Sequence, residues 1–401
     1  MLPESLGVGW LFAWKATYFL SLVSGLLIWG NLSLEHFHQV NARWPREGEP
    51  VFASHFATWD GAHYLLLSEQ GYAKDVPSCA FYPLWPLVMR ATAPLFGGNP
   101  LVGGLVLSNL ASLAAWVMFY RLVERRWGKR SALWALVFLI VFPGSLFFQF
   151  IYSESLFLLL LMGLWWALEE RRHGWAAVCA GLLPLCRGVG AFVVLPLAWH
   201  ALSVAPPGWL KCGPSGGEGR EDAKEDERRG GEPGGQDWAP WLLVGMPLLG
   251  WGVYLALMWH WTGNPFEGFA AQKHWAVHSV ANLWNVPKFV IGFFSPTEWH
   301  AFRGSLLDRC IFVLLLYTLP VLWRLDKGLL VWAYVLGILP AMSGTFTSFV
   351  RFASCTFPMF IALGVVLNRR KWRWWRYGLL ASFAALHLVL VWRFVNFRWA
   401  G

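Results

Sequence analysis

Long apolar stretches, joined by short polar connections, run along almost the whole chain. They lie near residues 9–30, 100–120, 131–148, 153–168, 174–186, 189–204, 239–260, 304–323, 328–344, 351–367 and 377–396. An α-helix of about 20 apolar residues crosses the hydrocarbon core of a bilayer and satisfies its own backbone hydrogen bonds there. Only 14% of the 401 residues are charged, too few to cover the surface of a soluble domain. The sequence therefore predicts an all-α, polytopic membrane protein of about 11 transmembrane helices, forming a single domain over 1–401.

Basic residues gather in alternate connections between these stretches. The connections 121–130, 169–174, 324–328 and 368–376, with the segment 204–238, hold more than half of the 32 Lys and Arg residues. Short basic loops stay in the cytoplasm. The basic residues behind the net charge of +9 are thus distributed as at a membrane surface. We therefore expect the lipid bilayer, and not nucleic acid, as the partner.

The remaining long connections then divide between the two sides. Residues 31–99 and 261–303 form two extracytoplasmic loops, the first carrying short interfacial helices. Residues 205–238 are rich in glycine and in charges of both signs, with no apolar period, and we expect a disordered cytoplasmic linker. Polar and ionisable residues concentrate on the outer side, so any chemistry is expected there.

The first outer loop contains the run "WDGAHYLLLSEQG" (59–71), which predicts a short helix from Asp60 to a terminating Gly71. Asp60 has two interpretations. As an N-cap it stabilises the helix by about 1 kcal/mol, whereas as a carboxylate at the bilayer surface it can meet a hydroxyl of a lipid-borne substrate. His63 lies on the same helical face and is either a packing residue or one that orients the carboxylate or a phosphate. The run "AFYPLWPLVMR" (80–90) follows, and its prolines predict a rigid, extended loop.

Several other outer residues are either interface anchors or site groups. Glu154, in "YSES", opens one stretch, and Arg187 and Arg351 open two others. Guanidinium groups are the preferred bidentate partners of phosphate, although a snorkelling arginine is the alternative. The residues expected to contact substrate are Trp59, Glu154, Arg187, Gln272, Lys273, His274 and Arg351.

No nucleotide-binding loop is present, so an activated sugar would have to arrive through the lipid. The six cysteines are scattered without metal-ligand spacing. We therefore expect no cofactor and no metal site, although oxygen and nitrogen ligands on the outer side leave a divalent metal open as an alternative.

These motifs resemble one family. "WDGAHYLLLSEQGY" and "AFYPLWPLVMR" resemble the W-D-x-x-H-…-G-Y-…-A-F-F-P-…-P-…-R signature of PIG-V-like mannosyltransferases, the second mannosyltransferases of GPI-anchor synthesis. "FPGSLFFQFIYSESLF" (142–157), "CRGVG" (186–190) and "RFASCTFP" (351–358) are similar to later motifs of the family, in the same order. The chain departs from the family pattern at Tyr82, Val189 and Phe352.

The resemblance implies a GT-C glycosyltransferase that takes a sugar from a polyprenyl-phosphate donor such as dolichyl-phosphate mannose. It implies a glycolipid or glycan acceptor, and it matches Asp60 and His63 to the motif's acid and histidine. With the residue-level interpretation, it predicts an inverting displacement with Asp60 as general base. We expect a prokaryotic relative in the plasma membrane with an extracytoplasmic active site, or the endoplasmic reticulum membrane if the source is eukaryotic. The alternative is a secondary transporter or lipid flippase, whose charged groups should lie at mid-membrane.

Overall fold

The structure, a computed structural model, describes residues 9–30, 37, 44, 51–206, 238–275 and 278–401. Within these ranges the chain is helical, and one isolated bridge, Glu298 to Ser305, is the only β pairing. The all-α prediction is thus confirmed. The predicted linker, 205–238, lies almost entirely outside the described residues, as does much of the first half of the 31–99 loop.

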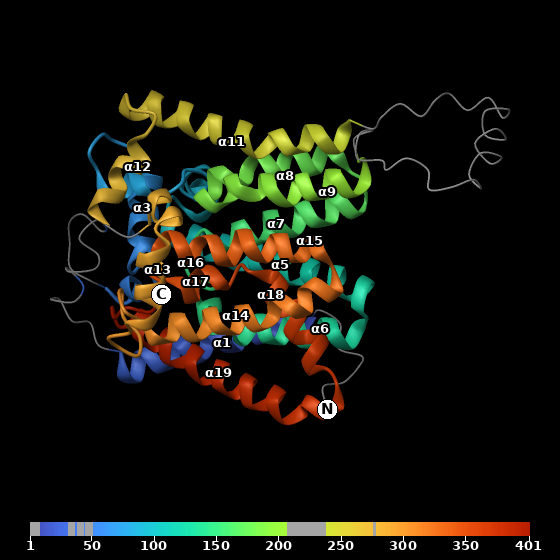
Figure 1. Cartoon of the computed structure of the whole chain (residues 1–401). Helices are drawn as coiled ribbons and strands as arrows, with labels where there is room; N and C mark the ends of the chain where they lie inside the picture. The colour runs from blue at the N-terminus through green and yellow to red at the C-terminus, as the bar shows by residue number, and fades with distance from the viewer. Residues whose placement is uncertain (1–8, 31–36, 38–43, 45–50, 207–237, 276–277) are drawn as a thin grey trace.

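The helices run as a bundle with short elements at one end (Figure 1). The α-helices are α1 (Gly9–Trp29), α3 (Asp60–Gln70), α4 (Leu84–Thr92), α5 (Pro100–Trp127), α6 (Lys129–Val141), α7 (Glu154–Glu169), α8 (His173–Cys186), α9 (Val194–Val204), α11 (Ala239–Thr262), α12 (Glu267–Ala271), α13 (Val286–Phe294), α14 (Leu306–Leu325), α15 (Lys327–Ala333), α16 (Leu339–Gly344), α17 (Phe349–Ala353), α18 (Phe357–Leu367) and α19 (Arg373–Val395). A π-helical turn at Tyr334–Ile338 joins α15 to α16.

Six of the described helical segments are long and apolar enough to cross a membrane. They are Gly9–Trp29, Pro100–Trp127, Ala239–Thr262, Leu306–Leu325, Lys327–Gly344 and Arg370–Val395. The other predicted spans became shorter helices, because breaks such as the turn at Pro143–Phe148 divide the apolar stretches. The six long helices support an integral membrane protein, while the count of about 11 spans stays a prediction.

The long helices pack side by side, and α8 lies between α7 and α11 (Figure 1). On the other side of the bundle α18 packs on α6, and α5 lies against α6 and α7. The short helices α3, α12, α13 and α17 gather at one end (Figure 1). This arrangement places the predicted site segments, which are far apart in sequence, at the same end of the bundle.

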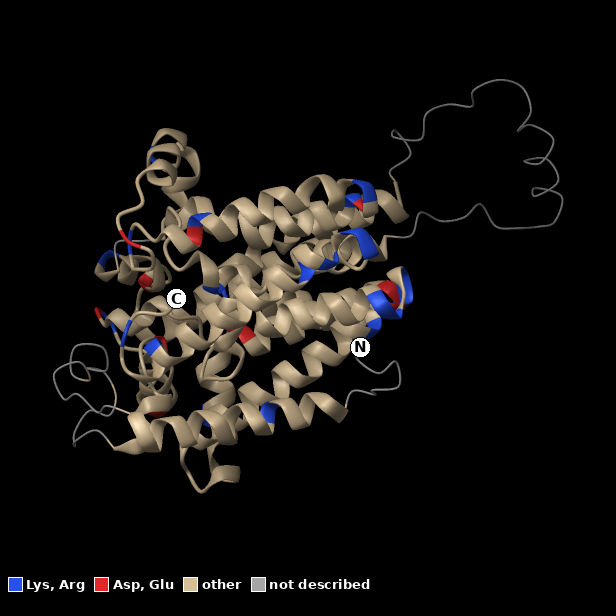
Figure 2. Cartoon of the chain, turned by 90° about the horizontal axis from the view of Figure 1, so that it is seen from below, with Lys and Arg blue, Asp and Glu red and all other residues tan. Residues whose placement is uncertain are grey.

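Basic side chains collect at the other end (Figure 2). There Arg126 pairs with Glu169 at 2.7 Å and with Asp326 at 2.8 Å. These pairs join the end of α5 to α7 and to the α14–α15 turn. Paired charges at helix ends suit the bilayer surface, and the described connections 121–130, 169–174 and 324–328 lie together at this end.

A lysine near the start of the chain is buried inside the bundle. Lys15 of α1 is 5% exposed, and its ammonium donates to Asn109, Ser112 and Gln149, each at 2.7 Å. A buried ammonium is costly unless such acceptors surround it. These bonds fix α1 to α5 and to the segment that leads into Glu154.

Two local predictions require correction. Asp60 is the first residue of α3 and not its N-cap; Trp59 holds that position, with φ of 54° and no capping side chain. Residues 61–68 of α3 are buried, so the helix packs inside the protein and does not lie on a surface. The termination at Gly71 is confirmed, with φ of 80° and its amide bonded to Leu67 O at 2.9 Å.

The prediction of an extended loop at 80–90 is wrong, because residues 84–92 form helix α4. Pro86 lies in the first turn of α4, where backbone N–H groups have no intrahelical acceptor. Proline is therefore tolerated there, and its presence does not exclude a helix.

Candidate active site

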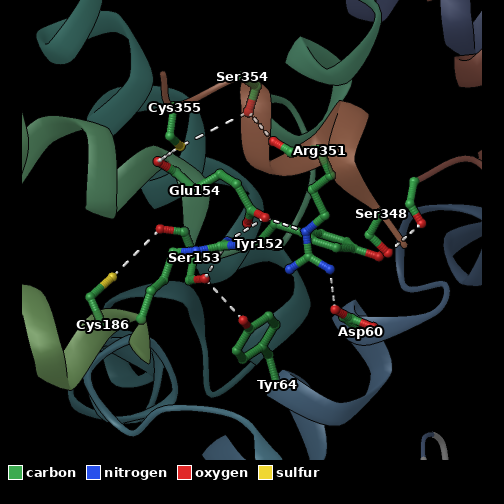
Figure 3. Close-up of polar contacts among 12 residues, drawn as sticks. Asp60, Tyr64, Tyr152, Ser153, Glu154, Cys186, Ser348, Arg351, Ser354 and Cys355 are labelled. Carbon is green, nitrogen blue, oxygen red and sulfur yellow. Dashed lines mark hydrogen bonds and ion pairs between the residues drawn. The ribbon is translucent and has the colours of Figure 1, made fainter. Parts of the chain in front are cut away.

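Four charged side chains from separate parts of the chain form one ion-pair network (Figure 3). Arg351 of α17 donates through Nη1 to Asp60 Oδ2 and through Nε to Glu154 Oε1. Arg187, at the end of α8, pairs with the same Glu154 oxygen through its Nη1. The predicted residues Asp60, Glu154, Arg187 and Arg351 are therefore in direct contact.

The members of this network differ in their access to solvent. The side chain of Glu154 is 0% exposed and that of Arg351 10%, whereas that of Asp60 is 19% exposed. Glu154 Oε2 is buried and has no hydrogen-bond partner among the described residues. Two acids and two guanidiniums balance in charge, so burial leaves no net charge uncompensated. Asp60 is the member best placed to meet a substrate.

The segment before Arg351 has an unusual backbone. Thr345, Phe346 and Ser348 have φ of 48°, 68° and 56°, in the left-handed region that non-glycine residues rarely adopt. Asp308 of α14, fully buried, accepts a 2.6 Å hydrogen bond from the Val350 amide. The surrounding protein thus holds this strained turn, which delivers Arg351 to the network.

Aromatic rings surround the two guanidiniums. The Arg351 guanidinium lies 4.6 Å from the Tyr152 ring, and that of Arg187 lies 4.7 Å from the Phe352 ring. Tyr64 of α3 hydrogen-bonds Ser153 at 2.9 Å, and both are labelled in Figure 3. These contacts restrict the arginines to one orientation and exclude water from behind them.

A small pocket opens beside Asp60 and Arg351. Trp59, Tyr152 and Phe147 form part of its lining, and Trp399 to Gly401 form another wall. The Ser348 hydroxyl donates to Gly401 O at 3.0 Å, which fixes this wall in place. The volume of about 10 Å³ accommodates about one water molecule.

His63 lies in α3 and contacts the loop that follows this helix. Its Nδ1 is 2.7 Å from Ser78 Oγ, and its ring stacks on Phe81 with centroids 5.0 Å apart. Trp275 packs against the same ring edge-on at 5.0 Å. His63 thus joins α3 to the following loop, and its catalytic role stays a prediction.

The other predicted contact residues, Gln272, Lys273 and His274, lie away from the network. Gln272, Lys273 and His274 form one short turn, in which the Lys273 side chain is 61% exposed. Lys273 Nζ lies 3.8 Å from Asp75 of the first loop. Trp275 donates to Pro77 O at 3.2 Å. This segment therefore packs against the first loop, not against the four-residue network.

Sequence reasoning did not single out His278, Tyr64, Tyr152 or Ser153. His278 packs on Phe352 with centroids 4.9 Å apart, and burial, with Arg187 and Arg351 nearby, lowers its pKa to about 4. Its one signal was its place after "KHWAV" in the predicted outer loop. Tyr152 and Ser153 directly precede Glu154 in the quoted "YSES" motif, which was the available signal for them.

In the described part of the chain, no three His, Cys, Asp or Glu side chains lie together as a metal site would need. The network instead offers one solvent-accessible carboxylate and two guanidiniums. Such a set can accept a proton and can stabilise anionic oxygen atoms.

Comparison with known proteins gives a family match over part of the chain. Residues 40–204 match the family model described as Mannosyltransferase (PIG-V). Together with the six long apolar helices, this match supports a membrane glycosyltransferase. It also confirms the resemblance to the PIG-V mannosyltransferases, over a region that contains Asp60, Glu154 and Arg187. Arg351 lies outside the matched residues.

Solved structures of an archaeal enzyme are similar at low identity. The Archaeoglobus fulgidus oligosaccharyltransferase with zinc and sulfate gives a TM-score of 0.44 at 14% identity, covering 80% of this chain and 45% of that chain. The oligosaccharyltransferase AglB of that organism, in complex with an inhibitory peptide and a dolichol-phosphate, gives 0.42 at 14% identity, covering 97% and 56%. This chain thus spans about half the length of these enzymes. None of the curated proteins matches it.

Proposed function

We propose that this protein transfers a mannose-like sugar from a polyprenyl-phosphate donor to a hydroxyl of a lipid-linked or surface glycan. The observation that carries the proposal is the contact of Asp60, in the family-matched region, with Arg351 at the mouth of a pocket. An accessible carboxylate beside guanidiniums suits a reaction that releases a proton on one side and a phosphate on the other.

Asp60 acts as the general base. It takes the proton of the acceptor hydroxyl while that oxygen forms a bond to the anomeric carbon of the donor. The bond from that carbon to the phosphate oxygen breaks, and its electron pair leaves with the polyprenyl phosphate. A single displacement inverts the anomeric configuration. General-base assistance contributes about 10²–10⁴-fold to such a step.

Arg351 and Arg187 stabilise the leaving phosphate. Both are paired with acids, so the donor phosphate has to compete for them. When Arg351 turns from Asp60 toward the phosphate, the Asp60 carboxylate is released to accept a proton. Donor binding and activation of the base are thereby coupled through one side chain.

Glu154 acts as a positioning residue. Its carboxylate is buried and holds both guanidiniums, so it fixes the site from behind without reaching the pocket. This assignment replaces direct contact between Glu154 and substrate. His63, joined to Ser78, keeps the first outer loop against α3.

Substrate entry requires a wall of the pocket to move, because its volume of about 10 Å³ excludes a sugar ring. The wall formed by Trp399 to Gly401 is the end of the described chain, and the Ser348 bond to Gly401 O would have to break for it to move. Outward movement of this wall would open the pocket toward the bundle end.

The membrane orientation is part of the proposal. The basic end of the bundle faces the cytoplasm by the positive-inside rule, so the Asp60 end faces outward. In a prokaryote this is the extracytoplasmic side of the plasma membrane. The network takes Asp60 from α3 and Arg351 from α17, short helices that lie at one end of the bundle (Figure 1), and this arrangement favours the transferase over a transporter with a mid-membrane site.

The test incubates the purified protein with labelled polyprenyl-phosphate sugars and a membrane lipid extract, followed by mass spectrometry of the products. The proposal expects a glycolipid heavier by one hexose, formed only with the polyprenyl-phosphate donor and with inverted anomeric configuration. Absence of any sugar transfer, or transfer from a nucleotide sugar alone, would overturn it.

A further inference from the structure

A second cavity lies at the far end of α3 from Asp60. It has a volume of about 410 Å³, and Leu67, Pro86 and Leu87 give it an apolar lining. Gln70 and Arg90 add polar groups, from the end of α3 and from α4. We call this cavity the α3–α4 groove. It is large enough for a ligand, whereas the pocket at Asp60 is not.

Arg90 is the last residue of the "AFYPLWPLVMR" signature, and the mechanism above does not use it. It is exposed, and no acidic side chain of the described residues lies within the 4.0 Å of an ion pair. Arg187 and Arg351, by contrast, are each held by an acid. Arg90 therefore gives the groove a positive charge, which an anionic ligand can neutralise. Because guanidinium groups bind phosphate bidentately, a phosphate is the expected anion.

A flat aromatic wall completes the groove. The rings of Tyr72 and Trp261 stack with centroids 4.9 Å apart and planes 9° apart. The Tyr72 hydroxyl donates to Phe81 O at 2.9 Å, which fixes this pair. Trp261 is at the outer end of the long apolar helix α11, the depth at which Trp and Tyr meet lipid headgroups. An apolar floor, an aromatic wall and one cation at this depth fit a phospholipid headgroup and the first part of its chains.

The length of α3 determines which of the two substrates, donor or acceptor, can place its phosphate in the groove. Its 11 residues place the groove about 15 Å from Asp60. In the donor, the phosphate is bonded directly to the reacting carbon, so it cannot lie in the groove while that carbon reacts beside Asp60. A phosphate held at Arg90 during the reaction therefore belongs to a molecule other than the donor.

We propose that the α3–α4 groove binds the phosphate of a phospholipid-anchored acceptor, with Arg90 as its partner. The inference rests on the proposed transferase function. The acceptor's glycan then extends along α3, and only a hydroxyl about 15 Å from the phosphate reaches Asp60. The distance between the groove and Asp60 therefore selects acceptors by the length of glycan between the phosphate and the reacting hydroxyl.

Binding is tested first, without catalysis. Native mass spectrometry of the full chain in detergent measures the fraction of protein that retains a lipid. The two lipids compared are phosphatidylglycerol and a diacylglycerol with the same acyl chains but no phosphate. We expect retention of the phospholipid only, a loss of about tenfold in Arg90→Gln, and a smaller loss in Arg90→Lys. Lys74→Gln, which removes an exposed cation outside the groove, is the matched control and should bind as wild type. Equal binding by Arg90→Gln and wild type would overturn the inference.

Transfer is measured next, with a phospholipid-linked glycan and with the same glycan on an uncharged alkyl chain. Arg90→Gln should raise the KM for the phospholipid-linked acceptor about tenfold. The donor KM and kcat should stay within about twofold of wild type, and the KM for the uncharged acceptor should not change. If Arg90→Gln still transfers sugar and its KM for the phospholipid-linked acceptor is unchanged, Arg90 makes an ordinary lipid contact. That result would overturn the acceptor assignment but not the transferase function. If wild type transfers no sugar but binds phospholipid through Arg90, the transferase proposal and the acceptor assignment fail, and the groove remains only as a phospholipid site.

Discussion

Arg351 and Asp60, 291 residues apart in the chain, share an ion pair that also connects through Arg351 to Glu154. The acid from α3, Asp60, is the proposed base. The partner from α7 is buried and holds the arginine in place. One guanidinium therefore links the reacting carboxylate to the interior of the bundle, and its exact shape matters as much as its charge.

Replacement of Arg351 by lysine tests that shape. Lysine keeps the charge but lacks the planar fork that reaches two acids at once. We expect Arg351→Lys to lower kcat for sugar transfer about 10- to 100-fold, in proportion to the loss of one or two charge-assisted bonds. Arg370→Lys, at the basic end of the bundle, should retain wild-type rates. Equal activity of the two variants would contradict the bridging role.

Replacement of Glu154 by glutamine leaves two buried guanidiniums with one acid. Breaking a buried pair in this way costs about 3–5 kcal/mol. Glu154→Gln should therefore lower the unfolding temperature and reduce kcat while the acceptor KM changes little, because Glu154 does not face the pocket. Glu124→Gln, which removes the half-buried partner of the exposed Arg121, is the control for loss of an ion pair. A raised KM with unchanged stability would instead indicate direct substrate contact.

Lys15 provides a test of the fold away from the site. Lys15→Met removes the donor for the oxygen acceptors of Asn109, Ser112 and Gln149. Each unsatisfied buried group costs about 1–3 kcal/mol. The variant should unfold at clearly lower temperature than wild type in the same detergent. Lys327→Met, at an exposed position, should change the unfolding temperature little, and similar values for both would show that the Lys15 bonds do not stabilise the bundle.

His278 predicts a pH dependence of stability. Burial and the nearby arginines lower its folded-state pKa from 6.5 to about 4. Between these values the unfolded chain binds the proton and the folded chain does not, so stability falls as pH is lowered from about 6.5 toward 4. His278→Gln should lose part of this dependence, measured as unfolding temperature against pH. A variant as pH-sensitive as wild type would assign the effect to other histidines.

Much of the site could be predicted from sequence because its residues stood out against an apolar background. Asp60, Glu154, Arg187 and Arg351 are charges beside membrane-length stretches, and such charges are rarely accidental. Their pairing with one another could not be predicted, because it depends on how α3, α7 and α17 pack. The sequence thus predicts that the arginines bind phosphate, but it does not predict their ion pairs with Asp60 and Glu154.

The errors have local causes. The prolines of residues 80–90 predict an extended loop, whereas the first turn of α4 accepts Pro86. The length of the helix at Asp60 predicts a place at the membrane surface, whereas its burial depends on tertiary contacts. His278 carried no motif, and only the fold brings it beside Phe352.

The most direct test of the account measures sugar transfer by Asp60→Asn, which keeps the shape of the side chain and removes its capacity as a base. We predict a loss of about 10²–10⁴-fold in kcat, with donor and acceptor still bound and with the unfolding temperature near that of wild type. Transfer at close to the wild-type rate by this variant would contradict the central claim.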